Sequence, residues 1–206
     1  MKLLFMLCGG LLAFLPAARA LTLPGSEQVM QAFAALDANR NRGISAAEWE
    51  KASFTLFRAA DANNDNALVL SELTGTTLAE YTFMLADDDR NSQLSISEYM
   101  KLRRAIFKAA DIDRDESLIE VEFELYSLLA QAGWTDRNNN GYIEPSELKA
   151  SIDQAFPQLD QDRNGYLTPA ELGYMRPAQF RLSDADGDDR LTPAEFVRGY
   201  LKALGA

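Results

Sequence analysis

Aspartate, asparagine and glutamate recur along this chain at a fixed spacing. Seven twelve-residue segments each begin with Asp and end with Glu, and Asp or Asn occupies their third and fifth positions. A hard cation such as Ca²⁺ is held by about six to eight oxygen atoms at roughly 2.3–2.6 Å, and these side chains supply such oxygens. The segments, numbered loops 1 to 7 in chain order, are 37–48, 61–72, 87–98, 111–122, 136–147, 160–171 and 184–195.

Each loop offers ligands from five positions. An Asx-rich loop can curl so that the side chains at positions 1, 3 and 5 and the carbonyl of position 7 converge, and the Glu at position 12 closes the shell with both oxygens. The Ile or Leu at position 8 is expected to point away from the ion and to pair with its counterpart in another loop. The expected ligand residues are Asp37, Asn39, Asn41, Gly43, Glu48, Asp61, Asn63, Asp65, Ala67, Glu72, Asp87, Asp89, Asn91, Gln93, Glu98, Asp111, Asp113, Asp115, Ser117, Glu122, Asp136, Asn138, Asn140, Tyr142, Glu147, Asp160, Asp162, Asn164, Tyr166, Glu171, Asp184, Asp186, Asp188, Arg190 and Glu195.

A single segment of this kind is readily explained as a polar surface loop, because Asp and Asn favour turns. Seven of them, starting 24 to 26 residues apart, indicate an internal repeat instead. The pattern resembles the EF-hand calcium-binding superfamily across residues 29–200. The resemblance implies an all-α fold of seven EF-hand-like loop–helix repeats, with short β-bridges between paired loops and Ca²⁺ in up to seven sites.

The segments between the loops carry the apolar pattern of helices. The residue four before each loop is Phe in all loops but the fifth, and the residue after each Glu is aromatic or Leu. These positions face the core in an entering and an exiting helix. Four loops also have Ser or Thr three residues before the Glu, which is the capping-box pattern of a helix start. These residues are Ser45, Ser95, Thr168 and Thr192.

The spacing between loops is short for this superfamily. About twelve residues separate one Glu from the next Asp, which leaves room for one helix of roughly 14 residues shared between neighbouring loops. Consecutive loops are therefore expected at opposite ends of a helix, with pairing between non-adjacent loops or across halves of the molecule. Pro157 and Pro177 are expected to kink or split two helices, and Gly75 and Gly133 to loosen two others.

The loops differ in how closely they follow the superfamily pattern. Position 6 is normally Gly because the turn needs a positive φ, and only Gly141 and Gly165 match, whereas Arg42 and Glu116 suit it poorly. The formal charge at positions 1, 3, 5, 9 and 12 ranges from −2 in loop 1 to −4 in loops 4 and 7. We therefore rank loops 6 and 7 strongest, loop 5 close behind, loop 4 intermediate and loop 1 weakest.

The compact spacing also resembles the lanmodulin family of bacterial lanthanide-binding proteins. That family typically has Pro at position 2 and a carboxylate at position 9. Here no loop has Pro at position 2, and Glu144 is the one carboxylate at position 9. A lanthanide-binding periplasmic protein therefore stands as the alternative to a calcium-binding one.

The composition excludes several other classes. The chain has 31 acidic and 20 basic residues, a net charge of −11, no His and one Cys. The acidic balance argues against nucleic acids and anionic membrane surfaces as partners. Without His, imidazole triads and His/Cys zinc sites are excluded. No phosphate cradle or nucleophile elbow appears, and we expect no enzymatic activity.

Residues 1–20 have the pattern of an export signal. Lys2 precedes the apolar run Leu3–Leu15, and Ala18-Arg19-Ala20 offers a cleavage site. We therefore expect a signal peptide at 1–20, an EF-hand repeat domain at 21–206, and a periplasmic or secreted protein. A calcium sensor would open a Met-rich groove. Because few Met residues would remain after cleavage, a buffering or structural role is favoured, with any protein partner unidentified.

Overall fold

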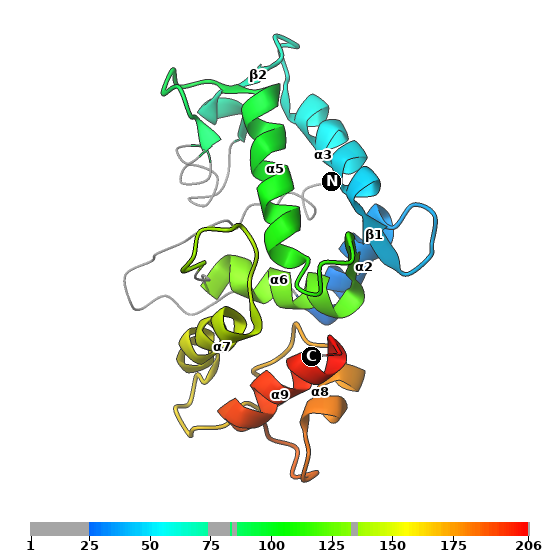
Figure 1. Ribbon diagram of the computed structural model, residues 1–206, viewed down its shortest axis with the longest axis vertical. Helices are drawn as coiled ribbons and strands as arrows, with labels where there is room; N and C mark the ends of the chain where they lie inside the picture. Colours follow the sequence, from blue (N-terminus) through cyan, green and yellow to red (C-terminus); the bar gives the residue numbers. More distant parts are fainter. Residues whose placement is uncertain (1–24, 74–82, 84–85, 133–135, 206) are drawn as a thin grey trace.

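The computed structural model describes residues 25–73, 83, 86–132 and 136–205 (Figure 1). The fold is mostly helical, with two small antiparallel sheets among these residues. In this described part, no helix is both long and apolar enough to cross a membrane. The expected signal peptide at 1–20, Gly75 and Gly133 lie outside the described residues.

The elements follow the order that the repeat predicts, with a helix after most loops. In chain order they are α2 (Ser26–Leu36), β1 (Gly43–Ser45), α3 (Ala46–Ala60), β2 (Ala67–Leu68), the 3₁₀-helix η1 (Leu70–Leu73), β3 (Leu94–Ser95), α5 (Ile96–Ala110), β4 (Ser117–Ile119), α6 (Glu120–Ala132), α7 (Pro145–Leu159), α8 (Pro177–Ser183) and α9 (Pro193–Ala203).

Long helices are shared between consecutive loops, as expected. Helix α3 runs from loop 1 to loop 2 and α5 runs from loop 3 to loop 4, each over 15 residues. The two helices lie side by side (Figure 1). The rings of Phe57 and Tyr99 meet at one end with centroids 5.4 Å apart, and those of Trp49 and Phe107 meet at the other at 5.9 Å, so the helices run antiparallel.

The loops pair through the apolar residue at position 8. Loops 1 and 4 pair through β1 and β4, loops 2 and 3 through β2 and β3, and loops 6 and 7 through an isolated bridge. The expected β-bridges are therefore confirmed for these six loops. The position-8 partners are Ile44 with Leu118, Leu68 with Leu94, and Leu167 with Leu191.

Pairing between non-adjacent loops is correct for loops 1 and 4 but wrong for the other two pairs. Loop 2 is followed by the four-residue η1, and loop 6 by a run of turns at 169–174. The residues between η1 and loop 3 lie mostly outside the described part of the chain. After loop 6, where 169–176 are described, no long helix carries the chain away, and loop 7 returns beside loop 6. The Thr168 hydroxyl does donate to Glu171 (2.8 Å), but no helix follows it, whereas Ser45, Ser95 and Thr192 each cap one.

The two proline positions have different outcomes. Helix α7 continues through Pro157 to Leu159 and is not split. Pro157 lies in the last turn, where the backbone hydrogen bond it removes is one of the last of the helix. Pro177 is the first residue of α8, where a missing N–H costs nothing, and the segment before it is interrupted as expected.

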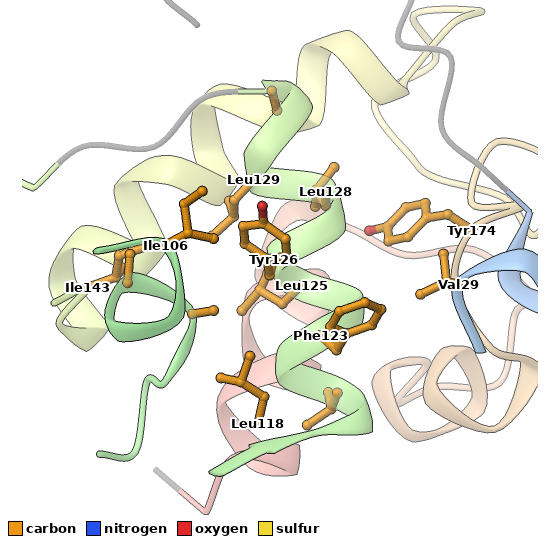
Figure 2. Packing of buried hydrophobic residues seen from close by; sticks show 14 of the residues in the cluster. Val29, Ile106, Leu118, Phe123, Leu125, Tyr126, Leu128, Leu129, Ile143 and Tyr174 are labelled. Carbon is orange, nitrogen blue, oxygen red and sulfur yellow. The ribbon is translucent and has the colours of Figure 1, made fainter. Parts of the chain in front are cut away.

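Helix α6 lies at the centre of the core. It contacts α2, α5, α7 and α9, and in Figure 1 it crosses between the α3–α5 pair and the C-terminal helices. The six Phe residues and Ala132 that precede the loops are all buried. Figure 2 shows the side chains of α6 among those of other elements; the labelled ones are Phe123, Leu125, Tyr126, Leu128 and Leu129, with Val29, Ile106, Leu118, Ile143 and Tyr174 around them.

Candidate metal centres

The Asp at position 1 is the C-cap of the preceding helix in loops 1, 2, 4, 6 and 7, and in every loop it organises the backbone. In six loops its backbone N–H donates to the carbonyl of the buried Phe four residues earlier, at 2.9 Å. In all seven loops its Oδ2 accepts the backbone N–H of position 6, at 2.8–3.1 Å. The carboxylate is therefore turned into the loop and not toward solvent.

The side chains at positions 3 and 5 are fixed in the same way. In every loop the Oδ1 of position 3 accepts the N–H of position 5 at 2.9–3.3 Å. The Oδ1 of position 5 accepts the N–H of position 7 at 2.7–2.9 Å. Asp and Asn serve equally in this arrangement because each offers an Oδ1.

The Glu at position 12 fastens both ends of each loop. Its Oε1 accepts a backbone N–H from position 2 or 3 at 2.8–3.2 Å. Its Oε2 accepts the N–H of position 9 at 2.9–3.1 Å. Both carboxylate oxygens therefore face the loop, which is the orientation that a bidentate ligand needs.

The turns in the loops use two left-handed residues each. Position 6 has a positive φ in all seven loops, including Arg42 at 73° and Glu116 at 66°, so residues that suit this conformation poorly still adopt it. Each such residue costs on the order of 1 kcal/mol. Position 4 is also left-handed in every loop. Four loops have Arg there, which carries no turn signal, and the other three have Asn or Gly, which favour this conformation. These residues are Arg40, Asn64, Arg90, Arg114, Asn139, Arg163 and Gly187.

Four loops bring three carboxylates together at ion-binding distance. In loops 3, 4, 6 and 7, oxygens of positions 1, 3 and 12 all lie within 4.8 Å of one another. Oxygens around one Ca²⁺ at roughly 2.3–2.6 Å can be at most about 5 Å apart, so the spacing fits that ion. Loops 1, 2 and 5 have Asn at position 3, which offers an amide oxygen in the same place.

The carboxylates differ in their electrostatic environment. Glu122 in loop 4 is fully buried, and burial raises its pKa to about 7. Burial also raises the pKa of Asp111 in the same loop. By contrast, the backbone N–H and then the hydroxyl of Ser45 lower the pKa of Glu48. Loop 4 is therefore the loop in which burial most opposes carboxylate charge.

A comparison with known protein families supports the class that this geometry indicates. A family model described as EF hand matches residues 152–173, which contain loop 6 and the second half of α7. The match supports assignment to the EF-hand calcium-binding superfamily. No curated protein matches the chain.

Proposed function

We propose that this chain is an exported calcium-binding protein without enzymatic activity, in which up to seven EF-hand-like loops order as they bind ions. One observation carries the proposal: loops 1 to 7 share one hydrogen-bond network that turns the oxygens of positions 1, 3, 5 and 12 into the loop. A polar surface loop has no need of such a repeated arrangement.

The ligand residues would have different roles at the different loop positions. The Asp at position 1 and the Asx residues at positions 3 and 5 replace water around the ion, and the Glu at position 12 closes the shell. The ion supplies positive charge that offsets the net charge of −11. Because the ion-free chain repels itself, ion binding should contribute much of the folding free energy.

Within this function we favour buffering or a structural role in the periplasm or outside the cell. Loops 6 and 7 are proposed as the strongest sites and loop 1 as the weakest, because ligand charge is lowest in loop 1. Metal ions are the proposed partners, without nucleic acid and without a membrane once the signal peptide is removed.

Competition between Ca²⁺ and La³⁺, followed by native mass spectrometry of the chain from residue 21, tests the proposal. We expect several Ca²⁺ ions to bind at micromolar to millimolar concentration, with stoichiometry rising stepwise toward seven. Retention of La³⁺ against a large excess of Ca²⁺ would favour the lanthanide alternative. Binding of neither ion would refute a metal-binding function.

A further inference from the structure

An asparagine ligand must present its oxygen, and not its amide nitrogen, to a cation. In loops with one Asp and one Asn at positions 3 and 5, the neighbouring carboxylate fixes this choice. The Nδ2 of Asn91 donates to Asp89 Oδ2, and the Nδ2 of Asn164 donates to Asp162 Oδ2, both at 2.9 Å. With the nitrogen held there, the Oδ1 remains available to the loop interior.

Loop 5 has Asn at both positions, so neither Asn has such a neighbour. Here the carboxylate of Glu144 at position 9 accepts a hydrogen bond from both side-chain amides. The Nδ2 of Asn140 donates to Glu144 Oε1 at 2.6 Å, and that of Asn138 donates to Oε2 at 3.2 Å. The Oδ1 atoms of both Asn residues then occupy the same hydrogen bonds as in the other loops, at 3.0 and 2.7 Å.

Glu144 is itself held from loop 4. The Nη2 of Arg114 donates to Glu144 Oε1 at 2.6 Å, and its guanidinium lies 4.4 Å from the ring centre of Tyr142. Lys108 lies 4.1 Å from the same ring centre and donates to the carbonyl oxygen of Asn140 at 2.6 Å. Loop 5 has no β-partner among the described residues, and these cations attach it to α5 and loop 4.

Loop 1 provides the natural contrast, because it also has Asn at positions 3 and 5. Its position 9 is Ser45, whose hydroxyl donates to Glu48 Oε2 at 2.7 Å. Ser45 has no carboxylate with which to hold Asn39 and Asn41. The two loops therefore share their ligand types and differ in whether a carboxylate orients the amides.

We propose that Glu144 is a positioning residue that turns the amide oxygens of Asn138 and Asn140 toward a cation in loop 5, and that Arg114 of loop 4 holds Glu144 in place. The inference rests on the proposed calcium binding. It makes loop 5 dependent on a side chain from its neighbouring loop.

The test uses the full chain labelled with ¹⁵N-glycine and titrated with Ca²⁺. The Gly141 N–H donates to Asp136 Oδ2 and reports loop 5, whereas the Gly165 N–H donates to Asp160 Oδ2 and reports loop 6 in the same sample. We expect E144S to weaken Ca²⁺ binding at Gly141 about tenfold and to leave the midpoint at Gly165 unchanged. R114Q should weaken it about threefold, and only while Glu144 is present.

A background variant separates positioning from direct binding by Glu144. N138D gives Asn140 the carboxylate neighbour found in loops 3 and 6, so E144S should then have little effect on affinity. The same tenfold loss in both backgrounds would overturn the proposal. A second readout is hydrogen exchange at the side-chain amides in the Ca²⁺-loaded protein: E144S should quicken exchange at Asn138 and Asn140 and spare Asn164.

The response of the wild type to Ca²⁺ tests the proposed function, and the response of the variants tests the positioning role of Glu144. If neither glycine responds to Ca²⁺, the proposed function fails. If Gly165 responds and Gly141 does not, or if both respond and E144S changes neither affinity nor amide exchange, the positioning role fails and the proposed function stands.

Discussion

Loops 1 and 4 share a backbone arrangement and differ in the environment of their final Glu. They pair in one ladder, with Ile44 opposite Leu118. Glu48 receives the backbone N–H and hydroxyl of Ser45, which lower its pKa. Glu122 is fully buried, and burial raises its pKa to about 7. The same loop arrangement therefore holds the final Glu in its charged form in loop 1, whereas in loop 4 burial opposes the charge of Glu122 until a cation offsets it.

Removing the charge of Glu48 or of Glu122 should change Ca²⁺ binding in loops 1 and 4 more than any other substitution considered. Both E122Q and E48Q should weaken Ca²⁺ binding in their own loop by at least about 100-fold, because a bidentate ligand is lost. In the ion-free protein at pH 8 the two should differ in sign. E122Q should stabilise the fold by roughly 1–3 kcal/mol because a buried charge is removed.

E48Q should destabilise the ion-free fold by about 0.5–1 kcal/mol, because charged hydrogen bonds from Ser45 are weakened. Urea unfolding of the wild type and both variants in chelator measures these differences. A loss of stability in E122Q equal to that in E48Q would contradict the assigned environments.

Acid should distinguish the two loops without mutation. A proton on Glu122 competes with the ion, so Ca²⁺ affinity in loop 4 should fall about tenfold between pH 8 and pH 6, given a pKa of about 7. Loop 1 should keep its affinity over this range because the pKa of Glu48 is lowered. Ca²⁺ titrations measure the affinity of each loop when they are read at the backbone amides of Glu116 and Arg42, which donate to the position-1 carboxylates.

The same shift predicts the pH dependence of ion-free stability. A carboxyl group whose folded pKa is raised contributes stability that is greatest below its ordinary value near 4.5 and is lost as the pH rises through about 7. The ion-free wild type should therefore lose stability between these pH values relative to E122Q. Parallel stability curves for the two proteins would show that Glu122 is not buried in the ion-free state.

A steric change where loop 1 contacts loop 4 should have a smaller effect on stability. A Cβ added at Gly43 would lie 2.3 Å from Ser117 Oγ across the ladder. G43A should destabilise the protein by about 1 kcal/mol because one side chain must move. Adding S117A to G43A removes the obstructing oxygen and should recover most of the lost stability. G25A is a matched control, since a Cβ there meets no atom within 4 Å.

Removing the Ser45 hydroxyl, which lowers the pKa of Glu48, should have a smaller effect than the preceding substitutions. S45A removes a helix cap and should cost about 0.5–1 kcal/mol in chelator, and it should also weaken binding in loop 1. T55A is a control in the following helix, because the Thr55 hydroxyl donates to Lys51 within α3 and touches no loop ligand. If S45A and T55A weakened Ca²⁺ binding in loop 1 equally, the Ser45 hydroxyl would have no specific role in that site.

Much of the local structure could be predicted from the sequence, because its determinants lie within a few residues. The caps at Ser45, Ser95 and Thr192 and the buried Phe residues before the loops are examples. The pairing of loops 6 and 7 could not, because it depends on the turns at 169–174 that stand where a full helix is expected. The segment after loop 6 contains Gly173, a poor helix former, and its carbonyl accepts the N–H of Ser26 from α2 at 2.8 Å.

The site was predictable to a similar degree. The recurring Asp, Asx and Glu positions give the local hydrogen-bond network, since each contact spans only a few residues. The burial of Glu122 and the contact of Arg114 with Glu144 were missed. Both arise where segments far apart in the sequence pack together, and no spacing rule encodes them.

Thermal unfolding of the mature chain in excess Ca²⁺ and in excess chelator, with bound ions counted by native mass spectrometry, tests whether the loops order around calcium. We predict several bound Ca²⁺ ions and a melting temperature higher by at least about 10 °C with Ca²⁺, because each filled site adds to folding stability. An unchanged melting temperature, with no ion retained, would show that these loops do not order around calcium.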